Sequence, residues 1–205
     1  MSNFFEIDFL EAGNTGSGDA IAVRYGQHGG TQYIHVVDGG YSEDGTKLID
    51  HIKEHYGDPS FIDHVVLTHP DGDHAAGLKA ILEEFEIGML WMNRPWNHLD
   101  DLMPRFDYDY TVTGLRQRLR SDFPHTAQLE DLAEELGIEI RDAFQGQQIG
   151  EFTVLSPSYA TYLDLIVASQ KTPEPEREAA IKGNIFERAV TAFKNILVEW
   201  GHENL

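Results

Sequence analysis

The sequence predicts an α/β fold in which sheet and helices form layers, and three observations support this. Near the N-terminus, apolar residues alternate with polar ones, as they do in strands. Further along, apolar residues recur every three or four positions, as they do in helices. The elements then follow one another in a strand-helix-strand order, which is typical of layered α/β proteins. The 205 residues allow one domain, or one domain with a sizeable insertion.

The first three segments are predicted to be strands of a meander. Phe5, Ile7 and Phe9 alternate with charged residues, which is the period of a half-buried strand. A second strand is expected over residues 19–25 and a third over residues 31–37. Glycine-rich stretches separate these segments and favour turns between them.

The next segments predict helices that alternate with parallel strands. Apolar residues four positions apart predict a helix over residues 48–56. Residues 62–68 are largely apolar and predict a strand that is buried on both faces. After a polar loop, a helix is expected over residues 78–85 and a strand over residues 87–92.

The second half of the chain predicts shorter elements. Thr126 is a candidate cap for a helix that ends at Gly137. The other expected elements are a helix around residues 115–119, strands at 138–140 and 152–155, and a helix at 161–169. We therefore predict an α/β domain over residues 1–158 and a helical insertion or tail over residues 159–205.

The predicted tail carries a long apolar stripe. Its members are spaced by four and three positions, in a heptad-like pattern: Phe186, Val190, Phe193, Leu197 and Trp200. Such a stripe needs a partner surface. Packing on the chain's own domain and homodimerisation both provide one.

The charge and composition exclude several classes of function. The chain has 35 acidic and 15 basic residues, so its formal net charge is −20, which disfavours a broad grip on long nucleic acids. Arg116, Arg118 and Arg120 form a local basic cluster that either contacts a phosphate or lies on a solvated helix face. The chain has no cysteine, so a metal ion must be bound by His, Asp or Glu.

No targeting signal or membrane span is visible in the sequence. The first residues lack the basic and apolar regions of a secretory signal. Nowhere do 18 apolar residues follow one another. We therefore expect a cytoplasmic protein that has no membrane partner.

One short segment has the chemistry of a metal site. His69, Asp71, Asp73 and His74 place two imidazoles and two carboxylates within six positions, after a predicted strand and before a helix. This set of donors suits zinc, manganese or iron. Gly72 is expected to let the backbone turn sharply there. Helix capping accounts for a single aspartate, but it gives no reason for the two histidines.

The segment HVVLTHPDGDHAAGL at 64–78 resembles the metallo-β-lactamase-fold hydrolases, and most closely the branch related to the hydrolase domain of DNA-uptake competence proteins. The superfamily motif is HxHxDH, and this chain has Asp71 at the second position, as is common in that branch. Three other segments agree with the resemblance: FFEIDFLEAGNTGSGDAIAVRYG, YIHVVDGG and FTVLSPS. The likeness runs from residue 3 to about residue 158 and looks like the first half of a two-half fold.

The resemblance implies a layered αββα fold with two divalent metal ions, zinc or manganese. By position, His69 and Asp71 would bind the first ion, and Asp73 and His74 the second. Asp73 would also be catalytic, because it would orient the attacking water. Asp38 would support the metal loop through hydrogen bonds. The carboxylate at position 71 shifts the first site towards oxygen ligands, which makes manganese more plausible.

The resemblance also implies ligands that the sequence does not show. The family supplies two further histidines and a bridging aspartate from its second half. His98, His125 and His202 are candidate replacements, although none lies in the expected setting at the end of a strand. The chain is therefore a fragment, or is completed by a partner segment or a second subunit, or has a degenerate site.

The resemblance points to a metal-dependent hydrolase that acts on a phosphodiester in a nucleotide or a short nucleic acid. The alternative is a non-catalytic half-domain that serves as a binding or assembly module through its C-terminal helix. A lactam or thioester hydrolase of the same superfamily is a third possibility, disfavoured only by the resemblance to the competence-type branch.

Overall fold

A computed structural model describes residues 3–13, 18–106 and 110–170 of the chain. The apolar stripe predicted over residues 186–200 lies outside the described residues, and so does His202. The boundary predicted at residue 158 stays a prediction.

The chain divides by its internal contacts into two compact units. The first unit combines Met1–Arg94 with Arg116–Ala143. The second combines Pro95–Leu115 with the described residues from Phe144 onward. The first five predicted strands and the predicted metal-binding motif all belong to the first unit.

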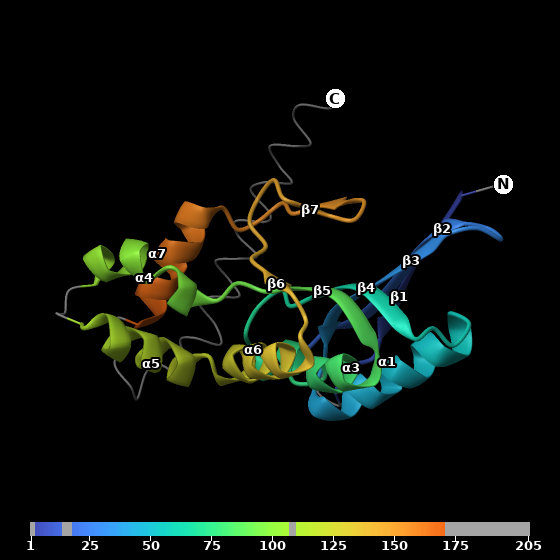
Figure 1. Cartoon of the computed structure of the whole chain (residues 1–205), viewed down its shortest axis with the longest axis horizontal. Helices are drawn as coiled ribbons and strands as arrows, with labels where there is room; N and C mark the ends of the chain where they lie inside the picture. The colour runs from blue at the N-terminus through green and yellow to red at the C-terminus, as the bar shows by residue number, and fades with distance from the viewer. Residues whose placement is uncertain (1–2, 14–17, 107–109, 171–205) are drawn as a thin grey trace. The chain divides into compact units, whose positions relative to one another are not determined.

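The first unit contains a six-stranded mixed sheet (Figure 1). Its strands lie in sequence order: β1 (Asn3–Leu10), β2 (Ala20–Gln27), β3 (Gln32–Gly39), β4 (Phe61–Val66), β5 (Glu86–Trp91) and β6 (Ile140–Arg141). The first three strands are antiparallel neighbours, and β3 to β6 are parallel neighbours. The mixed α/β fold that the sequence predicts is therefore confirmed.

Helices cover one face of this sheet. They are α1 (Ser42–His55), α3 (Leu78–Glu84) and α6 (Pro124–Leu136), with the single turn α2 (Gly72–Ala75) leading into α3 (Figure 1). The core between them buries Val36 and Val65 of the sheet together with Leu48, Ile52 and Ile81 of the helices, each with no exposed surface. The apolar spacing along α1 and α3 thus gives these helices their buried faces.

The second unit consists of shorter elements. They are the 3-10 helices η1 (Pro95–Asn97) and η2 (Met103–Arg105), α4 (Leu99–Leu102), the hairpin β7 (Gln148–Ile149) and β8 (Phe152–Thr153), and α7 (Tyr159–Gln170). The longer helix α5 (Val112–Asp122) crosses the division between the units. The helix predicted at 161–169 is confirmed by α7, whereas no strand was expected at β7.

Two predictions about helix ends have different outcomes. Gly137 ends α6 in the left-handed conformation, with φ of 73°, as expected. Thr126 is not the cap, because α6 begins at Pro124 and Phe123 precedes it as the N-cap residue. Proline suits the first helical position, where its missing N–H costs no hydrogen bond. Thr126 instead lies in the first turn and is only 1% exposed.

The predicted burial of β1 is wrong, although the strand itself is confirmed. Phe5 and Phe9 are 56% and 73% exposed. The polar face of β1 is the one that turns towards α1, because Asp8 accepts hydrogen bonds from the ring of His51 (2.9 Å) and the hydroxyl of Tyr56 (2.7 Å). Alternation gives the period of a strand, but it does not decide which face the helices cover.

The strand β4 is only partly buried, so the prediction of a fully buried strand is wrong. Ile62 and Val65 have no exposed surface, but Phe61 is 44% exposed. A parallel strand is buried on both faces only when helices cover the sheet from both sides. In the first unit the described helices lie on one side (Figure 1).

A row of aromatic and imidazole side chains crosses the middle of the sheet. The Nε2 atom of His35 lies 3.1 Å from the hydroxyl of Tyr25, and the rings of His35 and His64 are 4.7 Å apart. Trp91 donates a hydrogen bond to Nδ1 of His64 at 3.2 Å. Burial, and then the charge of His64, lowers the pKa of His35 to about 3. His35 is therefore neutral at physiological pH.

The two faces of the sheet should respond differently to mutation. Leu48→Ala should lower the free energy of unfolding by about 2–5 kcal/mol, because it leaves a cavity in the core. Phe9→Ser should change it by less than about 0.5 kcal/mol, because the ring is largely exposed. Urea unfolding of both variants measures this, and an equal loss in the two would show that β1 buries the opposite face.

Acid should destabilise the fold through His35. The unfolded chain binds a proton at His35 near pH 6.5, whereas the folded chain binds it only near pH 3, so the stabilisation present above pH 6.5 is lost as the pH falls. Between pH 7 and pH 5, the wild type should therefore lose about 2 kcal/mol more than His35→Gln. Urea midpoints at the two pH values test this. Equal losses in the two proteins would contradict a neutral buried His35.

Candidate metal centre

The candidate centre lies where β3 and β4 end. These strands are parallel, so their carboxyl ends meet at the same edge of the sheet. Asp38 is near the end of β3, and the motif follows β4 through a short loop into α2. Asp38 has a left-handed backbone with φ of 56°, which aspartate tolerates better than most residues.

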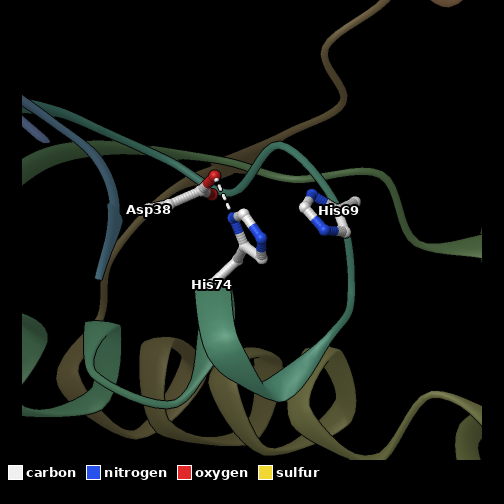
Figure 2. Close-up of side chains that lie close together, drawn as sticks. All are labelled: Asp38, His69 and His74. Atoms are coloured by element: carbon white, nitrogen blue, oxygen red, sulfur yellow. Dashed lines mark hydrogen bonds and ion pairs between the residues drawn. The ribbon is translucent and has the colours of Figure 1, made fainter. Parts of the chain in front are cut away.

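The carboxylate of Asp38 joins three parts of the centre. Its Oδ1 accepts a hydrogen bond from the backbone N–H of Thr68 at 2.8 Å. Its Oδ2 accepts one from the Thr68 hydroxyl at 2.5 Å and one from Nδ1 of His74 at 2.9 Å. Figure 2 shows Asp38 beside His74, with the ring of His69 close by. Only 1% of Asp38 is exposed, so these bonds have little competition from water.

These hydrogen bonds determine the tautomers of both histidines. A carboxylate can only accept, so Nδ1 of His74 carries the proton. The Thr68 hydroxyl gives its only proton to Asp38 and must accept from Nδ1 of His69, 2.9 Å away. Each imidazole is therefore left with an Nε2 lone pair that can bind a cation.

Each Nε2 atom faces a carboxylate of the motif. The distance is 3.9 Å from His69 Nε2 to Asp71 Oδ2 and 4.0 Å from His74 Nε2 to Asp73 Oδ2. Two ligands of one tetrahedral ion lie about 3.4 Å apart, so small side-chain movements would bring each pair onto an ion. This set of donors fits a divalent cation. Exposed carboxylates alone would not single out this place, but two oriented imidazoles do.

Asp38, His69 and His74 also form a compact donor group. One ligand atom from each lies within 4.8 Å of the others. Because Asp38 already accepts from Thr68 and His74, we place it behind His74 as an orienting carboxylate. This arrangement makes His74 a stronger ligand and fixes its ring.

The electrostatic surroundings of the two imidazoles differ. Burial, and then the charge of His74, lowers the pKa of His69. Burial would also lower the pKa of His74, but the hydrogen bond and charge of Asp38, with the charges of Asp73 and Asp19, outweigh it and raise that pKa. The ring centroids of His69 and His74 are only 3.7 Å apart, which disfavours charging both rings.

Three glycines allow the surrounding backbone segments to touch. A Cβ atom on Gly77 would overlap the carbonyl oxygen of Gly39, and one on Gly45 would overlap that of Gly77. The Gly77 N–H also donates to the Gly40 carbonyl at 3.1 Å. The end of β3, the start of α1 and the link between α2 and α3 are thus packed backbone to backbone, which keeps Asp38 near His74.

The expectation for Gly72 is wrong. Gly72 begins α2 and does not adopt a left-handed conformation, so a sharp turn is not what requires glycine. A Cβ atom at Gly72 would lie only 2.8 Å from Nε2 of His125. A side chain at position 72 would therefore displace the end of the His125 ring, which comes from α6. This contact could not be predicted, because Gly72 and His125 are far apart in the sequence.

Two residues near the motif were missed as site residues. The Oδ2 atom of Asp19 lies 3.8 Å from Nδ1 of His74. Its neighbour Gly18 lies against the backbone carbonyl of Asp73, where any Cβ atom would overlap. The signal that could have pointed to them is their place in FFEIDFLEAGNTGSGDAIAVRYG, one of the segments that resemble the family.

Other candidate residues have structural partners. In the second unit, the ring of His98 packs against Phe144, Tyr159 and Tyr162. In the basic cluster, Arg118 pairs with Asp122, and Arg120 pairs with Glu130 and Asp131. These ion pairs favour the interpretation of the cluster as a helix surface.

The fold and these donors define an α/β protein with a candidate metal centre of histidines and carboxylates. Residues 13–147 match the family described as the metallo-beta-lactamase superfamily. The chain therefore belongs to this superfamily, whose members are mostly metal-dependent hydrolases. None of the curated proteins compared with the sequence matches it.

One solved structure that the chain matches is that of a candidate metallo-beta-lactamase from Thermotoga maritima, with 13% identity and a TM-score of 0.38. The match covers 72% of this chain and 62% of the Thermotoga chain. In the described part of the chain, no helix is long and apolar enough to cross a membrane. The cytoplasmic location stays a prediction.

Asp38→Asn tests the orienting carboxylate. An asparagine has one acceptor oxygen in place of two, so it cannot receive both the Thr68 and His74 bonds in the same way. We expect a 10- to 100-fold loss of Zn²⁺ affinity, measured by competition with a chelator. Asp8→Asn is the matched control, because Asp8 also bonds a histidine but lies on the α1 side of β1. Unchanged affinity in Asp38→Asn would contradict the orienting role.

Proposed function

We propose that the chain forms the core of a two-metal hydrolase that cleaves a phosphodiester in a nucleotide or a short nucleic acid. The observation that carries the proposal is the pairing of His69 with Asp71 and of His74 with Asp73, with Asp38 behind His74. Imidazole and carboxylate ligands of this kind suit zinc and manganese. Membership of the superfamily supports the hydrolase class.

In this proposal the motif holds two divalent ions. His69 and Asp71 bind the first ion, and Asp73 and His74 bind the second. Bound divalent ions would lower the pKa of a water molecule and polarise the bond to be cleaved. Asp73 would accept a hydrogen bond from the attacking water and so orient it. Asp38 keeps the proton on Nδ1 of His74 and leaves Nε2 as the ligand.

The charge of the chain supports a small substrate. A net charge of −20 repels a long polyanion. Arg118 and Arg120 are held in ion pairs, so they offer little to a phosphate backbone. The resemblance to the competence-type branch supports a phosphodiester over a lactam or a thioester.

The motif alone gives each ion two protein ligands, whereas a catalytic metal usually has about three. We infer that a further segment, or a second subunit in a homodimer, completes the centre. This short ligand set also favours the second candidate function, a binding or assembly module that uses the predicted C-terminal stripe. The metal content of the purified chain, measured by elemental analysis, separates the two. Nearly two ions per chain support the enzyme, and no bound metal supports the module.

The substrate class can be tested directly. The Zn²⁺- and Mn²⁺-loaded protein is assayed with a chromogenic phosphodiester, a chromogenic β-lactam and a thioester. We expect turnover of the phosphodiester that a chelator abolishes. Turnover of only the lactam or only the thioester would overturn the proposed substrate while leaving the metal centre intact.

Asp73→Ala should remove the activity while the fold remains. The variant loses a ligand and the group that orients water, so turnover should fall at least about 100-fold. Asp50→Ala, at an exposed position of α1, is the control and should keep full activity. Circular dichroism checks that both variants are folded. Retained turnover in pure Asp73→Ala would exclude the proposed centre.

A further inference from the structure

We infer that His125 is an additional metal ligand, which α6 supplies from outside the motif. This inference rests on the proposed metal centre. It concerns a residue that is distant from the motif in sequence, so the spacing within HPDGDH cannot reveal it. The ligand would be added to one of the two proposed ions, whose carboxylate ligands Asp71 and Asp73 lie on either side of Gly72.

The first turn of α6 brings His125 to the metal loop. His125 is the second residue of α6, after Pro124, and α6 contacts α2. The imidazole lies against Gly72 at the start of α2. The absence of a side chain at this one position makes room for the ring. The contact therefore joins α6 directly to the segment between the two motif carboxylates.

The ring approaches the loop with a nitrogen. Measured from the position of a Cβ on Gly72, the nearest ring atom is Nε2 at 2.8 Å, while Cε1 and Cδ2 are at 3.4 and 3.5 Å. These three atoms form the far end of the ring, and the one nearest to Gly72 is the nitrogen that can bind a cation. This nitrogen is directed at the segment that carries the carboxylates.

His125 also has no polar partner in the described part of the chain. It makes no hydrogen bond or ion pair there, although the side chain is partly buried. Partly buried polar groups normally have a partner in the protein, in ordered water or in an ion. The nitrogens of His125 are not among the buried atoms that lack a partner, so water reaches the ring, and a cation can take the place of that water.

The number of ligands in the motif also supports His125 as a metal ligand. The motif provides one imidazole and one carboxylate for each ion, and one further nitrogen would bring an ion to the usual three protein ligands. The Nε2 atom is outside the compact group of Asp38, His69 and His74, so binding requires a rotation of the His125 side chain. The side chain is not fully buried, which leaves room for that rotation.

The experiment measures metal affinity in the full chain without any substrate. Zn²⁺ affinity is determined by chelator competition, and Co²⁺ is used as a spectroscopic probe of the ligands. His125→Ala and His125→Phe should both weaken Zn²⁺ binding at least about tenfold and alter the visible spectrum of bound Co²⁺. Phenylalanine keeps an aromatic ring against Gly72 but has no nitrogen. His55→Ala, on the exposed side of α1, is the control and should match the wild type.

Each result separates the inference from its alternatives. Wild-type affinity in His125→Phe with weak binding in His125→Ala would show that the ring only packs, and would overturn the inference. Wild-type affinity in both variants would overturn it as well. If the wild type itself bound no metal, the proposed function would fail, which is a different outcome.

Gly72→Ala gives an independent test, because it displaces the His125 ring without removing it. The new Cβ would push against the flexible end of the ring, so thermal stability should change little. Zn²⁺ affinity should nevertheless fall, and it should fall no further when Gly72→Ala is combined with His125→Ala. Additive losses in the double variant would show that Gly72 acts without His125 and would overturn the inference.

Discussion

The arrangement of the centre depends on the buried carboxylate of Asp38. This one side chain receives hydrogen bonds from the backbone and hydroxyl of Thr68 and from the ring of His74. It thereby links the end of β3, the loop after β4 and the first turn of α2. Without it, neither the rotation of the His74 ring nor its tautomer would be determined. The sheet places Asp38 near His74, and the Asp38 carboxylate fixes the orientation of His74 as a ligand.

The local parts of the fold could be predicted from the sequence, because they depend on short-range patterns. The strands and the helices α1 and α3 follow from periods of two and about four in the apolar residues. The metal motif could be recognised because His69 and His74 lie within one short segment. Its support by Asp38 was expected only through the resemblance to a family, since nothing in the local pattern links positions 38 and 74.

The other features could not be predicted, because they depend on contacts between distant segments. The burial of β1 depends on which side α1 covers, and the alternation of Phe5 and Phe9 with charged residues is compatible with either side. Gly72 looked like a turn residue, but the true constraint is the ring of His125. Single-sequence patterns carry no information about such approaches. Thr126 was misplaced as a cap for a different reason, because Pro124 is a better first helical residue.

The centre has a local charge that agrees with that of the whole chain. A net charge of −20 raises the concentration of cations near the surface, and the four candidate ligands then select among them by geometry. The hydrogen bonds of the two imidazoles engage their Nδ1 atoms and leave Nε2 as the atom that can bind a cation, so the affinity does not rest on negative charge alone. Overall charge would affect how fast a cation arrives, whereas the hydrogen-bonded donors would affect how long it stays.

The backbone contact among Gly39, Gly45 and Gly77 has a consequence for genetic screens. None of these residues carries a chemical group, yet any side chain there would force apart the segments that hold Asp38 and His74. Inactive clones from random mutagenesis should therefore include substitutions at these glycines as well as at ligands. An investigator who ranks positions only by loss of activity would count these glycines as catalytic, although their role is to let the backbone segments pack closely.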